Sequence, residues 1–351
     1  MKKWMIGAIG LLCCLLCIEP CRAATEQPAQ DLVLKNRHVE LVFDGGKEYL
    51  FKAFRCEGRN MLPDQGSATH PWVLTYRGPH GENPALQPRW GFYDGGRLIA
   101  GEGESTLEFT WRVVLGKLDE TWPVRVSVTL AEDSELPEWR LSAELPEGWV
   151  IVSSEFPRIA VRRPDDATGI LSVGYGAEYP IGASGQLQSR YPSCTGAMQL
   201  VLMRHGEGTA YFAAKDTEGS GKIFRMVSEG SRLVFVQEVT ASYGWSEGGE
   251  FSIPWPAVLG FSKEDWQATV LKWYRPFTFE TEWGRRTIAE RPIAEWIRQA
   301  DMWLRPANAT ESMMEAVRKA LKYYGKGVGM HWYYWHGHPF ETTYPAYFPV
   351  P

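Results

Sequence analysis

The chain has 351 residues, of which 44% are hydrophobic and 23% charged, and its formal net charge is −5. This length is enough for two domains, and the composition is that of an ordinary globular protein. The sequence contains no block of basic residues, which argues against nucleic-acid binding. Aromatic residues make up 13% of the chain, with 16 Trp. Flat rings of this kind can stack on sugar faces, although they also fill the cores of large β-sandwiches.

The first 23 residues predict export. Two lysines at positions 2 and 3 precede an apolar run at 4–18, and two alanines follow at 23 and 24. This order is typical of a cleaved signal peptide, and the run is shorter than the about 20 residues that a membrane-spanning helix needs. Cys21 follows Pro20 rather than a small residue, so we expect no membrane anchor. The mature protein is expected in the periplasm or outside the cell.

Few cysteines remain once this leader is removed. Four of the six lie within it, which leaves Cys56 and Cys194. Two cysteines are too few for a disulfide scaffold. They either form one bridge or sit as two small buried hydrophobic residues, and we favour the second alternative.

From about residue 31 to residue 261, apolar and polar residues alternate. Strict alternation indicates antiparallel strands with one buried and one solvated face. A dozen or more such strands without a helix predict a large two-sheet antiparallel β-sandwich (a supersandwich) over residues 24–261. Glycine pairs such as Gly95-Gly96 are interpreted as turns. The clearest strand segments are Leu107–Val113, Trp122–Leu130, Trp139–Leu145, Met198–Met203, Thr209–Ala214, Ile223–Val227 and Leu233–Val239.

Near Ser262 the pattern changes to helical spacing. Ser262 is expected to cap a helix that carries Trp266 and Trp273 on one face, and Pro276 is expected to end it. An irregular segment follows, so that residues 262–300 form a helical and irregular connector.

The last fifty residues predict a different fold class. A short strand at Met302–Leu304 precedes a helix from Thr310 to Tyr324, and a final strand is expected over Val328–Trp335. This order is typical of a parallel βαβ unit. We therefore interpret residues 301–351 as the start of an incomplete (β/α)8 barrel. Its open strand edges predict that residues 300–351 are poorly ordered or prone to aggregate.

In a (β/α) barrel the active site forms at the carboxyl ends of the strands. Four residues at the end of the predicted second strand are therefore candidates for substrate binding. Trp335 would stack on a sugar ring, His336 would donate a hydrogen bond to a hydroxyl, and Glu341 would accept one, with His338 beside them. Packing at the rim of a pocket is the alternative interpretation of all four.

Metal binding and catalysis receive less support from the same segment. Histidines 331 and 336 point to opposite faces of a strand, and Gly337 and Pro339 interrupt the strand that would align 336 with 338. We expect no metal and no cofactor. Glycoside hydrolysis needs two carboxyl groups about 5–10 Å apart. The barrel segment contains no convincing pair, so the catalytic residues stay unassigned; its acidic residues are Asp301, Glu311, Glu315 and Glu341.

Several segments resemble a known group of proteins. They are Leu271–Arg275, Ala294–Ile297, Met302–Arg305, and His331–His336 with the following Phe340 and Tyr344-Pro345. The chain resembles secreted bacterial proteins with a large N-terminal β-sandwich and an uncharacterised barrel domain grouped with the glycoside hydrolases. The resemblance implies a mutarotase-like supersandwich joined to a (β/α)8 catalytic barrel that acts on glycans. Such proteins usually have an acid, often Asp, where Glu341 stands, and their catalytic strands would lie beyond Pro351.

Three functions stay open on these grounds. The leading hypothesis is an exported carbohydrate-active protein of glycoside-hydrolase type, which acts on an oligo- or polysaccharide and lacks its catalytic residues in this chain. The second is a non-catalytic glycan-binding protein that uses the β-sandwich. The third is a polysaccharide lyase, which is disfavoured because nothing here encodes the helical toroid that usually accompanies that chemistry. The sequence does not predict an oligomeric state.

Overall fold

The computed structural model describes residues 30–331, except for positions 47, 65, 68, 80–84, 87–90, 116–119, 174–175, 207, 241–248, 306–309 and 326. The chain divides into two compact units, unit 1 ending at Trp273 and unit 2 beginning at Tyr274. The predicted leader and its four cysteines lie outside the described residues. No helix in the part of the chain described is long and apolar enough to cross a bilayer.

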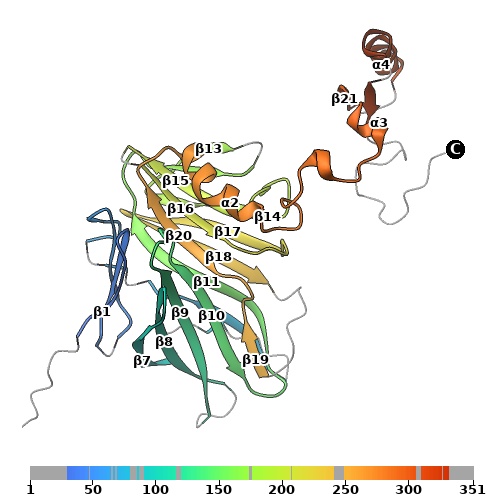
Figure 1. Cartoon of the computed structure of the whole chain (residues 1–351). Helices are drawn as coiled ribbons and strands as arrows, with labels where there is room; N and C mark the ends of the chain where they lie inside the picture. The colour runs from blue at the N-terminus through green and yellow to red at the C-terminus, as the bar shows by residue number, and fades with distance from the viewer. Residues whose placement is uncertain are drawn as a thin grey trace, which may run out of the picture. The chain divides into compact units, whose positions relative to one another are not determined.

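Unit 1 consists mainly of antiparallel strands (Figure 1). The larger sheet has ten strands in the order β13-β12-β15-β16-β20-β10-β9-β8-β7, with β19 also paired to β10. These strands are β7 (Gly91–Ala100), β8 (Glu104–Val114), β9 (Thr121–Ala131), β10 (Glu138–Leu145), β12 (Thr168–Leu171), β13 (Ala177–Pro180), β15 (Leu200–His205), β16 (Gly208–Ala214), β19 (Gly249–Ser252) and β20 (Ala257–Ser262).

A second sheet of six strands has the order β14-β17-β18-β11-β5-β6. Its strands are β5 (Val73–Arg77), β6 (Ala85–Leu86), β11 (Val150–Arg162), β14 (Ser184–Tyr191), β17 (Lys222–Glu229) and β18 (Arg232–Thr240). A four-stranded sheet precedes both along the chain and is formed by β1 (Leu32–Lys35), β2 (Val39–Phe43), β3 (Phe51–Cys56) and β4 (Arg59–Asn60).

The core of unit 1 follows from the alternation in the sequence. On β8, Leu107, Phe109 and Trp111 are buried, and the residues between them face outward. Because β9 and β10 pair with the same period, their apolar residues join one continuous core with those of the second sheet. The prediction of a mostly β, two-sheet antiparallel sandwich is confirmed, and each of the seven clearest predicted segments overlaps a strand.

The interpretation of Gly95-Gly96 as a turn is wrong. Both residues lie inside β7, where the pairing with β8 shifts between Tyr93 and Gly95. Gly95 has a φ of 116°, a conformation that a residue with a side chain rarely adopts. The pair therefore forms a bulge in an edge strand, which is a common place for such bulges.

The helical segment at the end of unit 1 starts later than predicted. Helix α1 (Trp266–Thr269) is capped by Asp265, which accepts a hydrogen bond from the backbone N–H of Ala268. Ser262 instead ends β20, and its hydroxyl accepts from Glu264 N–H. The chain continues as a π-helical turn, η2 (Val270–Tyr274). Trp273 packs edge-on against Tyr211 of β16, with 5.4 Å between ring centroids.

Unit 2 contains the predicted βαβ unit. Strand β21 (Met302–Leu304) pairs in parallel with β22 (Val328–Met330), and α4 (Glu311–Tyr324) connects them along the chain. Thr310 caps α4 as predicted, and the helix ends at Gly325. Before the unit come α2 (Arg275–Thr278), the 3-10 turn η3 (Ile288–Glu290) and α3 (Glu295–Arg298).

Two expectations for this part of the chain need correction. Pro276 lies in the first turn of α2 rather than ending a helix, which is a position where a proline is tolerated because the missing N–H has no helical partner. Strand β22 ends at Met330, and residues 332–335 lie outside the described part.

Cys56 and Cys194 are not bridged. Cys56 is half-buried, and burial raises the pKa of its thiol to about 12. Cys194 is exposed, so the expectation of two buried residues is wrong for Cys194.

Candidate functional site

The four predicted substrate-binding residues, Trp335, His336, His338 and Glu341, lie outside the described residues, and their roles stay predictions. The structure does describe strand β22, after which these four residues come in the chain. Strands β21 and β22 are parallel, so their carboxyl ends lie at one edge, and there the N–H of His331 donates to the carbonyl of Leu304 at 2.8 Å. This is the edge at which parallel α/β folds form their sites.

The acidic residues that the structure describes between positions 301 and 331, Asp301, Glu311 and Glu315, do not form a catalytic pair. Asp301 lies at the amino end of β21, next to Gly327. Glu311 and Glu315 are bound to basic residues of the same helix, with N···O distances of 2.7 and 3.0 Å, and lie on its exposed surface.

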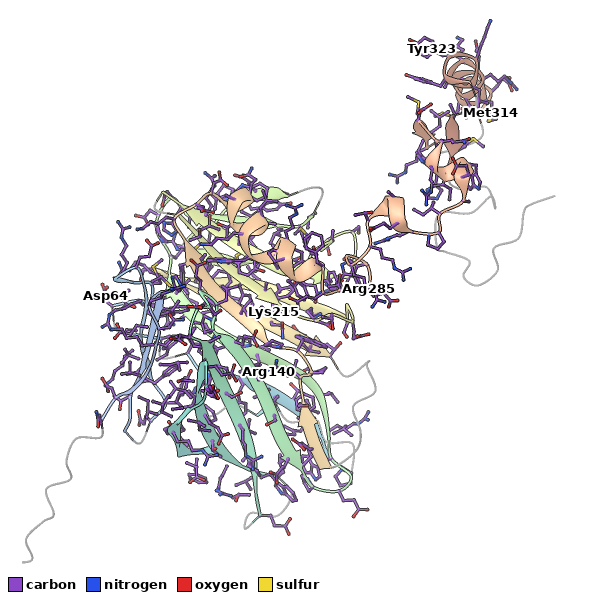
Figure 2. All side chains as sticks on the ribbon, viewed as in Figure 1. Asp64, Arg140, Lys215, Arg285, Met314 and Tyr323 are labelled. Carbon is purple, nitrogen blue, oxygen red and sulfur yellow. The ribbon has the colours of Figure 1, made fainter. Side chains whose placement is uncertain are left out.

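The larger sheet of unit 1 carries a polar hollow on its outer face, with a volume of about 610 Å³. We call it the polar trench. One cross-strand row, Gly95–Thr110–Arg125, runs through it from β7 to β9. Gly95 has no side chain, and a Cβ placed there would meet nothing within 4 Å. Figure 2 labels Arg140 on the same sheet, one strand beyond β9.

Three arginine–carboxylate pairs surround the polar trench. The Nη2 atom of Arg97 lies 2.7 Å from Glu108 and that of Arg125 lies 2.7 Å from Glu144, while Nε of Arg112 lies 2.9 Å from Asp94. All but one of the six side chains are at least 40% exposed, and Glu108 is 26% exposed. At this exposure each pair contributes about 0–1 kcal/mol to folding, so the fold does not depend on them.

An exposed aromatic side chain lies on the same face of the sheet as the polar trench, next to the residues that line it along β7. Phe92 of β7 lies directly opposite Arg112 of β8 and is 70% exposed. Directly opposed residues on paired strands project from the same face of the sheet. A ring, three cations and three carboxylates therefore share one face.

A second hollow, of about 640 Å³, has different chemistry. It lies beside α1 on the outer face of β12 and β15, and its walls include Ile170, Leu202 and Trp266. The indole N–H of Trp266 is already used, because it donates to Glu178 at 3.0 Å. An apolar lining leaves the many hydroxyls of a sugar without partners, so this hollow is the weaker candidate for a saccharide site.

Unit 1 also contains a buried lysine in an ion pair. Lys222 donates to Asp216 at 2.6 Å, to Gln199 at 2.7 Å and to the carbonyl of Ser220 at 2.6 Å. Its ammonium also lies 4.3 Å from the ring centroid of Trp255. Burial lowers the pKa of Lys222 to about 8, while the Asp216 carboxylate opposes the shift. All three donors are satisfied and the group is inaccessible, so we assign it to stability.

Metal binding receives no support from the described residues, among which no three His, Cys, Asp or Glu side chains are placed to hold an ion. Histidines 336 and 338 are outside that set. The expectation of no metal therefore stays a prediction.

Sequence reasoning missed the polar trench. The alternation showed that Arg112 and Arg125 face outward, but not that they approach each other across strands. Strand register decides that question. The available signal was the presence of Arg or Glu at outward positions of consecutive strands, together with a glycine pair in the edge strand.

Comparisons with known proteins support a relation to carbohydrate-active enzymes. Residues 251–351 match the model of a family described as a domain of unknown function, DUF6259. The chain is 61% identical over 345 residues to a protein of Bacteroides thetaiotaomicron named "Putative glycoside hydrolase". The match covers 98% of this chain and 51% of that protein, so the chain spans about half the length of this relative.

Solved structures of glycosidases share the fold at low sequence identity. An alpha-N-acetylgalactosaminidase from Bifidobacterium bifidum aligns with a TM-score of 0.63 at 14% identity, over 91% of this chain and 54% of that one. A GH36 alpha-galactosidase from Geobacillus stearothermophilus aligns with a TM-score of 0.51 at 10% identity, over 79% and 44%. These similarities show a common fold and not a common substrate.

Proposed function

We propose that this chain is part of an exported, carbohydrate-active protein of glycoside-hydrolase type. The observation that carries the proposal is the 61% identity to the Bacteroides protein over nearly the whole chain. In this proposal residues 24–261 form an accessory β-sandwich, 262–300 a connector, and 301–351 the start of a catalytic (β/α)8 barrel.

The described part of unit 2 supports the barrel interpretation. Its two parallel strands are joined by a helix, which is the repeating element of such a barrel. One element cannot bury both faces of its sheet: Trp303 of β21 is 52% exposed and Trp296 of α3 is 61% exposed. Their rings lie 6.1 Å apart. Further strands and helices, for which the longer relative has the length, would cover these side chains.

The positions of the carboxylates determine which part of the protein we propose to be catalytic. Asp301, Glu311 and Glu315, the acids that the structure describes between positions 301 and 331, form no suitable pair, so hydrolysis would use carboxylates from barrel strands that follow this segment. Trp335, His336, His338 and Glu341 would then line the sugar subsite at the carboxyl ends of the strands. Glu341 would accept hydrogen bonds from hydroxyls, and Trp335 would stack on a ring.

A chimera tests this proposal. The chain is fused to the half of the Bacteroides relative that it does not match, and both proteins are assayed against p-nitrophenyl glycosides of common sugars in both anomeric forms. We expect hydrolysis by the fusion and none by the chain alone. Glu341→Gln and His336→Ala in the fusion should lower turnover.

Two results would contradict the proposal. Hydrolysis by the chain alone would mean that the reactive groups lie in the sandwich. A folded fusion that cleaves none of the glycosides would remove the support for a hydrolytic function.

Export is tested separately. Expressed in a Bacteroides host, the protein should accumulate outside the cytoplasm with its N-terminus near residue 24, because a charged start and an apolar run direct secretion. Retention of residues 1–23 in a cytoplasmic protein would contradict it.

A further inference from the structure

The polar trench lies on the outer face of the larger sheet. Its shape follows from strand register. The row Gly95–Thr110–Arg125 has two short members, whereas longer side chains, Arg97 with Glu108 and Arg112 with Asp94, stand on either side of it. A channel across β7, β8 and β9 results, and it is open to solvent because Gly95 contributes no side chain.

Its hydrogen-bonding groups suit hydroxyls. Arg97 donates through Nε and Nη2 to a single oxygen of Glu108, at 3.0 and 2.7 Å. Arg112 donates through Nε to one oxygen of Asp94. These bonds therefore use one oxygen of each carboxylate. Each pair thus offers an acceptor next to cationic donors, and a sugar hydroxyl donates and accepts at once.

The charges of the polar trench favour neutral ligands over anionic ones. Three arginines face three carboxylates, so the polar trench is close to neutral, and a strongly anionic chain would meet Asp94, Glu108 and Glu144 at close range. A neutral chain meets no such repulsion. Phe92 adds an exposed ring on the same face for the apolar side of a pyranose.

We propose that the polar trench binds a neutral oligosaccharide. The assignment rests on the proposed function only for the class of ligand, a saccharide. Thr110 forms the floor, the arginine–carboxylate pairs bind hydroxyls, and Phe92 stacks on a sugar ring. Such a site would retain a saccharide on the surface of the sandwich.

The test uses the full chain and calorimetric titration. Neutral malto-, cello-, manno- and galacto-oligosaccharides are compared with acidic oligogalacturonides. We expect millimolar or tighter binding of at least one neutral series and none of the acidic one. Arg125→Ala removes charged donors, and Thr110→Tyr places a ring in the space above the floor. Each should weaken binding by about tenfold or more.

Arg232→Ala is the matched control. Arg232 is paired with Glu229 at 2.6 Å on the second sheet with similar exposure, and its loss should leave binding unchanged. Both trench substitutions are at outward positions, and unchanged thermal unfolding shows that the variants fold.

Absence of binding to every neutral series overturns the inference, as does binding that both trench variants retain or a preference for the acidic chains. These outcomes are independent of hydrolysis by the fusion protein. An inactive fusion with a binding chain would refute the proposed function alone, and an active fusion with a non-binding chain would refute this inference alone.

Discussion

The two units bury their apolar residues to very different extents. Unit 1 has a continuous core that includes three fully buried tryptophans, Trp72, Trp111 and Trp139. In the described part of unit 2, three apolar side chains are buried, Tyr274, Phe277 and Val317. Unit 2 nevertheless contains nine of the fifteen large apolar side chains that the described residues expose.

This contrast follows from architecture. Two large antiparallel sheets cover one face of each other and leave the other face to polar residues, so unit 1 is complete as a folded body. A parallel βαβ unit has one strand pair with apolar residues on both faces and needs neighbours on each. Under the proposed barrel, the exposed rings of unit 2 would be covered by further strands and helices, whereas the exposed charges of unit 1 form a solvated surface.

Replacing one tryptophan in each unit tests the contrast most strongly. Trp139 is fully buried against Phe43 and Phe51, and Trp303 is half-exposed. Trp139→Ala should lower the free energy of unfolding of unit 1 by about 3–5 kcal/mol. Trp303→Ala should lower that of unit 2 by clearly less than this, because about half of the Trp303 side chain is already in solvent. Urea unfolding followed by amide signals from each unit would measure both, and equal losses would refute the distinction.

Replacing Lys222 tests whether the stability of unit 1 depends on its buried polar groups. Lys222→Met leaves the Asp216 carboxylate, which is 2% exposed, without its cation. Removing one partner of a buried pair costs about 3–5 kcal/mol. Lys215→Met is the control: its partner Glu138 lies at 2.8 Å, both are about a third exposed, and the loss should stay below about 1 kcal/mol.

The same lysine predicts a pH dependence. Its pKa is lowered to about 8 in the folded protein from 10.5. Between these values the unfolded chain binds more protons, so the contribution of Lys222 to the free energy of unfolding rises with pH in this window. The rise should be absent in Lys222→Met. A difference between wild type and variant that does not change from pH 8 to 10 would contradict the assigned pKa.

A smaller effect is expected at the cap of α4. The Thr310 hydroxyl accepts a hydrogen bond from Met313 N–H, and the exposed helix has few other contacts in the described structure. Thr310→Ala should cost about 1 kcal/mol of helix stability. Amide exchange in α4 should speed up about fivefold, with no change in β8 to β10. Thr310→Ser keeps the hydroxyl and should restore the rate.

The sequence was sufficient for much of the fold. Period-two alternation on β8, β9 and β10 identified strands and their buried faces, because each face has one kind of environment. The helix from Thr310 to Tyr324 was also predicted, since a capping threonine and a terminal glycine mark its ends. The bulge at Gly95 could not be predicted, because a glycine pair has the same sequence signal in a turn and in an irregular strand.

The candidate site was much less accessible to sequence reasoning. The polar trench joins residues from β7, β8, β9 and β10 that are up to fifty positions apart, and their approach depends on register. The residues selected from the sequence, 335 to 341, rest instead on the rule that barrel sites lie at strand ends. That rule identifies an edge of the sheet and not the side chains that act there.

The smallest expected change in stability is at the end of unit 1, where the connector is hydrogen-bonded to Glu135. Glu135 accepts hydrogen bonds from Lys272 Nζ and Trp273 Nε1, both at 2.8 Å. Burial alone would raise the pKa of Glu135, but these two partners outweigh it and lower the pKa below its usual 4.5. The stabilisation is therefore present above pH 4.5 and is lost as the pH falls through the lowered value.

Glu135→Gln should remove this pH dependence. The pair with Lys272 is about a third exposed, so the effect should stay below about 1 kcal/mol. Amide exchange in η2, compared at pH 6 and at pH 3 after correction for intrinsic rates, would detect it. Lys272→Met removes one partner and leaves the indole N–H, so it should weaken the dependence without abolishing it. Equal acid sensitivity in wild type and Glu135→Gln would mean that packing of Trp273 on Tyr211, and not the carboxylate, holds the connector against the sheet.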